Sequence, residues 1–367
     1  MTRRGALAAM GSTVLAGLVG PLMAQPGAAP RLTHGFNLPG WVDRPDSLAP
    51  SEAVLEELRR AGFESVRLPV SGELIAAEDR SASIAMLDRI GQATRQLLDA
   101  QFAVVLDMHP SGPLAHLLKA EPDEAADVLA RAWSLLAERA ADLPATEVNA
   151  ELLNEPPLER QTWLALRDRL AEAVREKCPD HTLVWGPARY QGIWELADTP
   201  PLADPNTVAA VHYYTPMGFT HQCENWDSSP LGRLANLPFP ASPDNPAVTA
   251  LAAKLEQAGD KEASDFLARE FSSPWTAAHI DADFASAGEW SRANGCPVIL
   301  NEFGVLDFCV DPASRAYWIR AVRQAAERNG IGWTYWEVDH GFGFIADRKS
   351  TDGFDAGIVD ALLGSDR

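Results

Sequence analysis

The chain has 367 residues, of which 46% are hydrophobic and 22% are charged, so it can bury a large core. Its composition excludes a disulfide-dense miniprotein and a disordered chain, and its length suits one large α/β barrel or two ordinary domains. The formal net charge of −20 argues against nucleic acid or an anionic membrane as a partner, because no basic field offsets phosphate repulsion.

The first thirty residues have the pattern of an export signal. Arg3 and Arg4 precede an uncharged, mildly apolar stretch over 5–30, and paired arginines before such a stretch are typical of a twin-arginine signal. The glycines and the proline within this stretch disfavour a stable membrane-spanning helix. We therefore expect residues 1–30 to be a signal peptide. The mature protein, 31–367, is then expected to be periplasmic or extracellular, monomeric and free of the membrane.

Beyond the signal, short apolar runs alternate with amphipathic stretches, which is the pattern of a parallel sheet with crossover helices. Strands are expected at 33–38, 63–69, 102–109, 147–154, 182–187, 207–214, 297–303 and 331–337. Helices are expected at 51–61, 83–100, 123–141, 160–177, 276–294, 312–329 and 355–363, with a poorly defined one within 190–204. Four tryptophans of these helices are expected to serve packing: Trp133, Trp163, Trp290 and Trp318.

Eight strands with intervening helices match a (β/α)8 TIM barrel, although a large open doubly wound sheet would give a similar count. An open nucleotide-binding sheet normally has a glycine-rich turn after an early strand, and the segment 35–40 is not such a turn. We therefore predict a single barrel over 31–367. The stretch at about 215–274, after the sixth strand, interrupts the alternation. A structureless loop of that length would be unusual, so we expect a packed insertion or lid, with one or two small helices within 247–271.

Polar residues gather where the predicted strands end. Asn154-Glu155 and Asn301-Glu302 each follow a buried strand, and two strand-end carboxylates favour paired-carboxylate chemistry, of which glycoside hydrolysis is the commonest form. Each motif alone could be a solvent-facing cap, but buried polar groups are costly unless they are paired. Further strand-end residues of this kind are Arg67, His109, His212, Tyr214 and Trp336.

These motifs, in their order along the chain from about Thr33 to Trp336, resemble family 5 of the glycoside hydrolases, the cellulase-like retaining enzymes. The motifs are Gly35-Phe36-Asn37, Val66-Arg67-Leu68-Pro69, Asp107-Met108-His109, Leu153-Asn154-Glu155-Pro156, His212-Tyr213-Tyr214, Asn301-Glu302-Phe303-Gly304 and Trp333-Thr334-Tyr335-Trp336. The resemblance implies a retaining, endo-acting hydrolase of β-1,4-linked glucan, with Glu155 as general acid/base and Glu302 as nucleophile. It also implies that the site is completed by Arg67, His109, Asn154, His212, Tyr214 and Trp336.

The residue chemistry agrees with these roles. We expect Arg67 and Tyr214 to lower the pKa of Glu302, and the charge of Glu302 to raise the pKa of Glu155 so that it stays protonated. Asn154 is suited to bind the sugar 2-hydroxyl. Trp336 offers a flat floor for a sugar. Trp41, after the first strand, is a further candidate substrate-binding residue, and other loop aromatics are open between sugar platform and packing: Tyr190, Trp194, Phe219 and Trp226.

Several alternatives stay open at this point. The polymer could be mannan, xyloglucan or β-1,3/1,6-glucan instead, and a transglycosylase would use the same residues. A non-catalytic glycan-binding barrel would ordinarily have lost one carboxylate, and both are present. A metal-dependent barrel hydrolase would need a His-x-His pair on the first strand, where His34 stands alone, so no metal or other cofactor is expected.

Four cysteines suit an exported protein with one or two disulfides. Cys223 and Cys309 follow the sixth and seventh strands, which are neighbours in a barrel, and both loops belong to the same rim. We therefore expect a disulfide between them. Cys178 and Cys296 belong to the opposite rim but to non-adjacent strands, and we expect both to be free.

Overall fold

The computed structural model describes residues 32–44 and 48–364. The predicted signal peptide, 1–30, therefore lies outside the described residues. Within them, no helix combines the length and the apolar character that a membrane crossing requires.

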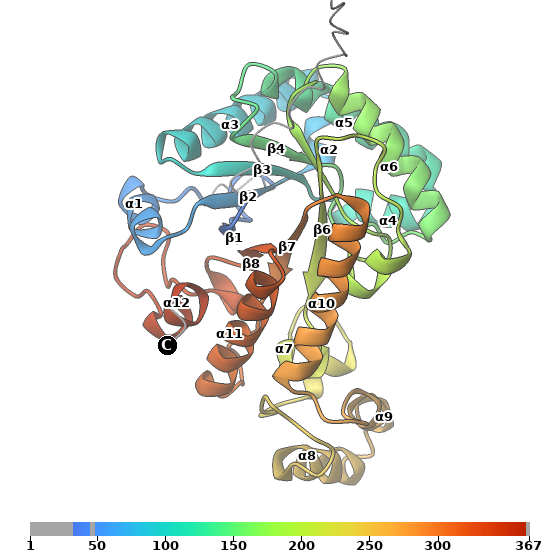
Figure 1. The fold of residues 1–367 in the computed structure, drawn as a ribbon, viewed down its shortest axis with the longest axis vertical. Helices are drawn as coiled ribbons and strands as arrows, with labels where there is room; N and C mark the ends of the chain where they lie inside the picture. The colour runs from blue at the N-terminus through green and yellow to red at the C-terminus, as the bar shows by residue number, and fades with distance from the viewer. Residues whose placement is uncertain (1–31, 45–47, 365–367) are drawn as a thin grey trace, which may run out of the picture.

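Eight parallel strands form a closed barrel in chain order, with the last strand paired to the first (Figure 1). The strands are β1 (His34–Asn37), β2 (Ser65–Val70), β3 (Ala103–Met108), β4 (Val148–Glu151), β5 (Thr182–Trp185), β6 (Thr207–Tyr213), β7 (Val298–Phe303) and β8 (Gly332–Tyr335). Each lies within one of the apolar runs predicted as strands, give or take a residue. The closed order confirms the (β/α)8 barrel and rules out the open doubly wound sheet.

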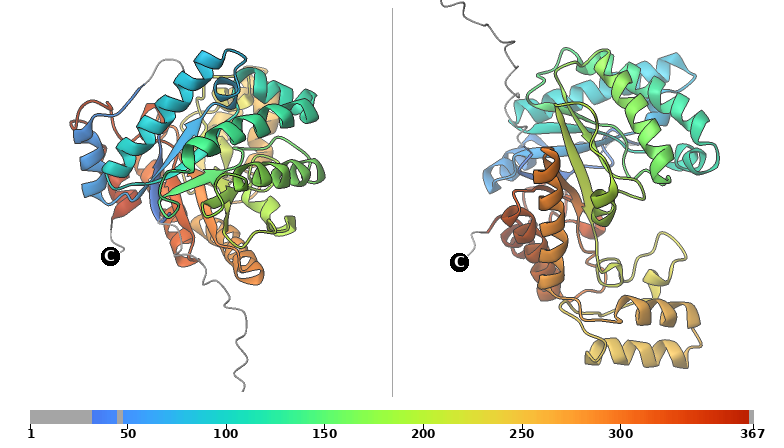
Figure 2. Two further views of the ribbon diagram at one scale, coloured as in Figure 1. Left: turned by 90° about the horizontal axis from the view of Figure 1, so that it is seen from above. Right: turned by 45° about the vertical axis from the view of Figure 1, so that its right-hand side comes forward.

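Helices surround the barrel on its outer side (Figure 2). Those that follow the predicted pattern are α1 (Glu52–Ala61), α3 (Arg80–Asp99), α5 (Pro122–Ala140), α6 (Arg160–Arg175), α10 (Ala277–Asn294), α11 (Pro312–Arg328) and α12 (Ala356–Leu363). The poorly defined helix after β5 is a short 3-10 helix, η1 (Ile193–Asp198). Two short helices near the rim were not predicted, α2 (Gly72–Ile75) and α4 (Gly112–Ala120), and a further 3-10 helix, η3 (His340–Phe342), follows β8.

Buried tryptophans on three outer helices form hydrogen bonds to the backbone just after the strands end. Each indole N–H donates to a carbonyl in the loop that follows β4, β5 or β6, so packing of the helix also fixes the start of that loop. The pairs are Trp133 with Leu152 (2.8 Å), Trp163 with Gly186 (2.8 Å) and Trp318 with Thr215 (3.1 Å). The predicted packing role of the helical tryptophans is thereby confirmed, and Trp290 is buried as well.

The segment after β6 is a packed insertion, as predicted, and projects from the barrel (Figure 1). It contains α7 (Met217–Thr220), the 3-10 helix η2 (Pro230–Arg233), α8 (Pro246–Gln257) and α9 (Lys261–Glu270). A disulfide joins Cys223 of this insertion to Cys309 of the loop after β7, with a Cα–Cα distance of 6.2 Å. This is the pairing expected from the sequence, and Cys178 and Cys296 are free, buried thiols.

Candidate active site

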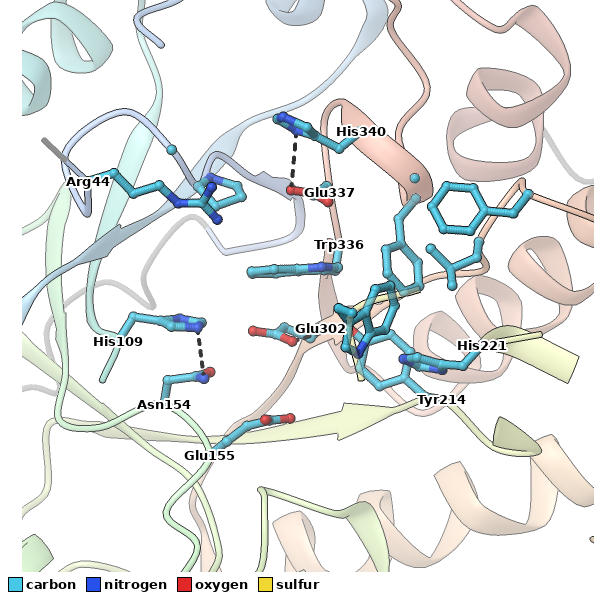
Figure 3. Close-up of a pocket in the computed structure, with 17 residues that line it drawn as sticks. Arg44, His109, Asn154, Glu155, Tyr214, His221, Glu302, Trp336, Glu337 and His340 are labelled. Carbon is cyan, nitrogen blue, oxygen red and sulfur yellow. Dashed lines mark hydrogen bonds and ion pairs between the residues drawn. The ribbon is translucent and has the colours of Figure 1, made fainter. Parts of the chain in front are cut away.

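The carboxyl ends of the strands surround a cleft of about 500 Å³ (Figure 3). Arg67 and His212 are buried behind its lining, and both contact Glu302. The structure thus brings together all but one of the predicted catalytic and substrate-binding residues. Those that line the cleft are His109, Asn154, Glu155, Tyr214, Glu302 and Trp336.

Trp41 is the exception, and its predicted role in substrate binding is wrong. The chain turns at Gly40, which has a left-handed φ of 81°, and Trp41 and Val42 then enter the hydrophobic core. Trp41 is only 4% exposed, because burial of a large indole is strongly favourable when packing allows it. Among the described residues of this loop, Pro39, Gly40 and Arg44 line the cleft instead.

Arg67, at the centre of the site, is 1% exposed and contacts three buried carboxylates. Its guanidinium donates to both oxygens of Glu151 (2.6 and 2.9 Å) and to Oε1 of Glu302 (2.5 Å), and it lies 3.1 Å from Asp107. It also donates to the amide oxygen of Asn154 (2.7 Å). Three carboxylates around one cation are tolerable only because each is also hydrogen-bonded or paired. Arg67 therefore fixes the position of Glu302 from behind.

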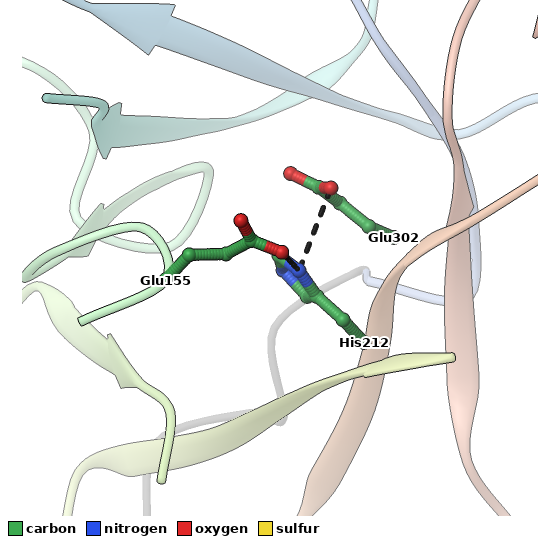
Figure 4. Close-up of side chains that lie close together, drawn as sticks. All are labelled: Glu155, His212 and Glu302. Carbon is green, nitrogen blue, oxygen red and sulfur yellow. Dashed lines mark hydrogen bonds and ion pairs between the residues drawn. The ribbon is translucent and has the colours of Figure 1, made fainter. Parts of the chain in front are cut away.

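Glu155 and Glu302 approach each other across His212, as Figure 4 shows. Nδ1 of His212 lies 2.9 Å from Oε1 of Glu155 and 3.4 Å from Oε2 of Glu302. One oxygen of each carboxylate and this ring nitrogen all lie within 4.8 Å of one another. Tyr214 donates its phenolic hydrogen to Oε2 of Glu302 (3.0 Å). Carboxyl groups this close are nearer to the separation of about 5–5.5 Å in retaining glycosidases than to that of about 6.5–9.5 Å in inverting ones.

Comparison with known proteins agrees with this geometry. The family model described as cellulase (glycosyl hydrolase family 5) matches residues 26–341. The chain belongs to glycosyl hydrolase family 5.

Curated relatives of this family 5 chain share about a quarter of its residues. Endoglucanase 3 of Fibrobacter succinogenes is 26% identical over 355 residues, which covers 89% of this chain and 52% of that protein. Endoglucanase H of Acetivibrio thermocellus is 22% identical over 91% of this chain and 33% of that protein. The chain thus spans about half and one third of the lengths of these two relatives.

Solved structures of the same fold include a hyperthermophilic endo-β-1,4-glucanase in complex with substrate, with a TM-score of 0.73 at 23% identity. That likeness covers 91% of this chain and 97% of the other. Cel5A of Thermotoga maritima in complex with mannotriose has a TM-score of 0.73 at 24% identity, over 90% of this chain and 97% of the other.

The two glutamates have altered proton affinities, and burial is the main cause. Desolvation raises the pKa of Glu302, although His212 and Arg67 oppose the shift. Arg67 lowers this pKa, as expected, but the cost of burial exceeds its effect, so the net shift is upward. Glu155 is 36% exposed, but to the cleft rather than to open solvent, and desolvation raises its pKa to about 7. This shift has the expected direction, yet burial rather than the charge of Glu302 is its main cause.

The pKa values of the two histidines of the family 5 site shift in opposite directions: desolvation lowers that of His212, whereas in His109 the neighbouring Asp107 outweighs desolvation and raises it. Burial lowers the pKa of His212 to about 4, so its ring is neutral near pH 7. His109 lies 2.8 Å from Asp107 through Nδ1 and 3.2 Å from the amide nitrogen of Asn154 through Nε2. Because the oxygen of Asn154 already accepts from Arg67, its nitrogen must face His109, so Nε2 accepts and Nδ1 donates. The His109 ring also stacks on Trp336, at 5.8 Å between centroids.

Several residues of the site were missed in the sequence. Glu151 is fully buried and receives hydrogen bonds from Arg67 and from Asn301 (2.7 Å). A charged residue inside the apolar run at 147–154 was a readable signal, because a buried carboxylate requires a buried partner. Asn37 belongs to a motif that was recognised, but its bond to Arg67 (3.0 Å) was not foreseen.

Additional side chains line the cleft around Trp336 and Tyr214, among them Arg44, His221, Glu337 and His340 (Figure 3). Trp226 of the insertion is 54% exposed and lines the cleft, with its ring near those of His221 and Phe342. Phe219, by contrast, is fully buried. Next to Trp336, burial and the neighbouring Asp339 raise the pKa of Glu337 to about 8.

Two groups of side chains in the described residues come close enough to hold a metal ion, and both have competing partners. In the first, Arg67 and Tyr214 already occupy the oxygens of Glu302 beside Glu155 and His212. In the second, which joins Glu337, Asp339 and His340, the guanidinium of Arg348 binds both oxygens of Asp339 (2.6 Å each). Neither group therefore offers a free set of ligands.

Proposed function

We propose that the chain is a retaining, endo-acting glycoside hydrolase that cleaves β-1,4-linked glucan. The observation that carries this proposal is the pair of glutamates, Glu155 and Glu302, whose oxygens lie within 4.8 Å of each other at the catalytic rim. Membership of family 5 supports it, as does the similarity to relatives named endoglucanases. Trp226 and Glu337 line the same cleft, so its walls extend past the two glutamates, and relatives named endoglucanases favour internal cleavage.

In the first step, Glu302 attacks the anomeric carbon while Glu155 protonates the departing glycosidic oxygen. Arg67 and Tyr214 each hold a different oxygen of Glu302, so the attacking carboxylate is oriented before substrate arrives. The pKa of Glu155 near 7 leaves it largely protonated in mildly acidic to neutral solution, as a general acid requires.

In the second step, Glu155 has lost its proton and acts as a base toward the water that hydrolyses the glycosyl-enzyme. His212 contacts both carboxylates and is neutral, so it can donate its Nδ1 hydrogen to whichever of them is charged. Asn154, held between Arg67 and His109, is positioned to bind the sugar 2-hydroxyl. Trp336, stacked on His109, provides an apolar floor for a sugar ring.

The proposal is tested by product analysis on purified polymers. We expect the protein to shorten carboxymethyl-cellulose and mixed-linkage β-glucan internally, with a rapid fall in viscosity and release of oligosaccharides whose new ends are initially β. Mannan is the second substrate to test, because the Thermotoga maritima relative was solved with mannotriose as well as with cellobiose. Xyloglucan and β-1,3/1,6-glucan complete the panel. Absence of products from every polymer, or initial release of α-ends, would contradict the proposal.

The pH dependence of kcat/KM should reflect the ionisation of Glu155 and Glu302. We expect kcat/KM for an unactivated substrate to fall as pH rises through about 7, because Glu155 must be protonated in the first step. On the acidic side, kcat/KM should fall with a midpoint above 4.5, the ordinary pKa of glutamate. The reason is that Glu302 must be ionised to attack and its pKa is raised. Glu155→Gln should remove the alkaline limb. If the limb persisted in that variant, another group would be responsible for it.

A further inference from the structure

The loop after β5 has a backbone conformation that is unusual for its sequence. Arg189, Tyr190 and Gln191 have φ values of 53°, 66° and 55°, so three consecutive non-glycine residues are left-handed. This conformation is unfavourable for L-residues and persists only where surrounding contacts hold it, often at functional sites. Arg189 and Tyr190 are exposed, whereas Gln191 is 0% exposed. The turn therefore directs the Gln191 side chain into the protein.

Gln191 joins three parts of the proposed catalytic site. Its Oε1 accepts the backbone N–H of Glu155 at 2.6 Å, and its Nε2 lies 3.4 Å from Oε1 of Glu151. Its backbone carbonyl accepts the N–H of His212 at 2.8 Å. The side chain fits only because residue 186 is glycine, since a Cβ there would lie 2.1 Å from Cγ of Gln191.

Glu155 needs such a partner because the chain has left the regular sheet before reaching it. β4 ends at Glu151, and Glu155 has a left-handed φ of 44° with Pro156 next in the chain. A backbone N–H at this depth requires an acceptor, which the strand ladder no longer supplies. The amide oxygen of Gln191 provides it, and a second bond from Tyr190 N to Pro156 O (3.2 Å) ties the same two loops together.

We propose that Gln191 is a positioning residue that sets the backbone of Glu155, and so aims its carboxyl group at the glycosidic oxygen. This inference rests on the proposed function of Glu155 as the acid/base. A misaimed acid slows the protonation of a poor leaving group but has little effect on a leaving group that needs no protonation. Loss of packing alone would instead disturb both glutamates and slow all substrates alike.

The test compares aryl β-cellobiosides whose leaving groups are phenol and 2,4-dinitrophenol. Gln191→Met fills nearly the same volume without the amide. It should lower kcat/KM for the phenyl substrate about tenfold or more, while the dinitrophenyl value changes by about twofold or less. Gln191→Glu keeps an oxygen for the Glu155 N–H and, in its protonated form, a donor toward Glu151, so it should restore much of the phenyl rate in acidic solution. Arg189→Ala, in the same turn but exposed, serves as the control and should match the wild type. Should Gln191→Met not fold, as judged by circular dichroism, Gln191→Leu, which also lacks the acceptor oxygen, provides the same comparison.

Equal losses on both substrates, or no loss on either, would overturn the positioning role of Gln191 while leaving the hydrolase proposal intact. Wild-type protein that cleaved neither substrate would overturn the proposed function and this inference with it.

Discussion

Glu302→Ala is expected to reduce hydrolysis of polymers and of aryl β-glycosides by about 10,000-fold or more, because the covalent step itself is lost. The residues that orient this carboxylate, Arg67 and Tyr214, would remain in place around a small void. With azide as an external nucleophile, any product must arise through a single inversion, so the glycosyl azide should be α. Nuclear magnetic resonance of the product distinguishes the anomers.

Glu155→Ala is the matched control because it removes the other carboxylate of the same pair. A 2,4-dinitrophenyl β-cellobioside should still form the glycosyl-enzyme, since its leaving group needs little protonation, but hydrolysis should stall without a base. Azide needs no base, so it should restore turnover and yield the β-azide by two inversions. If the two variants gave the opposite anomers, the roles of Glu155 and Glu302 would be exchanged. If neither variant lost activity, the active site would lie elsewhere.

Arg67→Met is expected to cause the largest loss of stability. It leaves Asp107, Glu151 and Glu302 buried without their shared cation, and breaking a buried pair in this way costs about 3–5 kcal/mol of unfolding free energy. In the variant these unpaired carboxyls should have folded-state pKa values above their unfolded values. Their protonation then favours the folded state at low pH, so the deficit should be largest near pH 7 and shrink toward pH 5. Urea denaturation at both pH values measures it.

The control for this prediction is Arg169→Ala, which removes an exposed ion pair with Asp127 (2.6 Å). An exposed pair contributes about 0–1 kcal/mol, so little change is expected. Equal losses in the two variants, or a deficit in Arg67→Met that did not depend on pH, would show that burial of the carboxylates is not what makes Arg67 important.

The strands and most of the site residues could be predicted from the sequence, because the strands close into a barrel. Apolar runs bounded by turn residues identified all eight strands, because period and length are strong signals for buried parallel strands. Once the strands close, every carboxyl end reaches the same rim. Residues as distant in sequence as Arg67 and Glu302 then meet, although nothing in either local segment indicates the contact.

What could not be predicted depends on local departures from regular geometry. β6 and β7 shift register so that Val211 pairs with Leu300 but His212 pairs with Glu302, and Asn301 is passed over. That irregularity puts His212 beside Glu302, and no pattern in the sequence marks it.

The sequence also gives no sign of the left-handed turn that buries Gln191, because no glycine or asparagine occurs at 189–191. The error at Trp41 has a different origin. An aromatic residue in a strand-end loop can face substrate or core, and only the path of the backbone decides.

In the proposed mechanism, Glu302 becomes covalently bound to the sugar. The most direct measurement is to incubate the protein with 2,4-dinitrophenyl 2-deoxy-2-fluoro-β-cellobioside and digest it for peptide mass spectrometry. Fluorine at C2 disfavours the oxocarbenium-like transition states of both steps, while the reactive leaving group still lets the first step proceed, so the glycosyl-enzyme accumulates. We predict one burst equivalent of dinitrophenol and a single fluorocellobiosyl group on Glu302. Labelling of Glu155 or of any other residue, or steady turnover to an inverted product without labelling, would contradict the account.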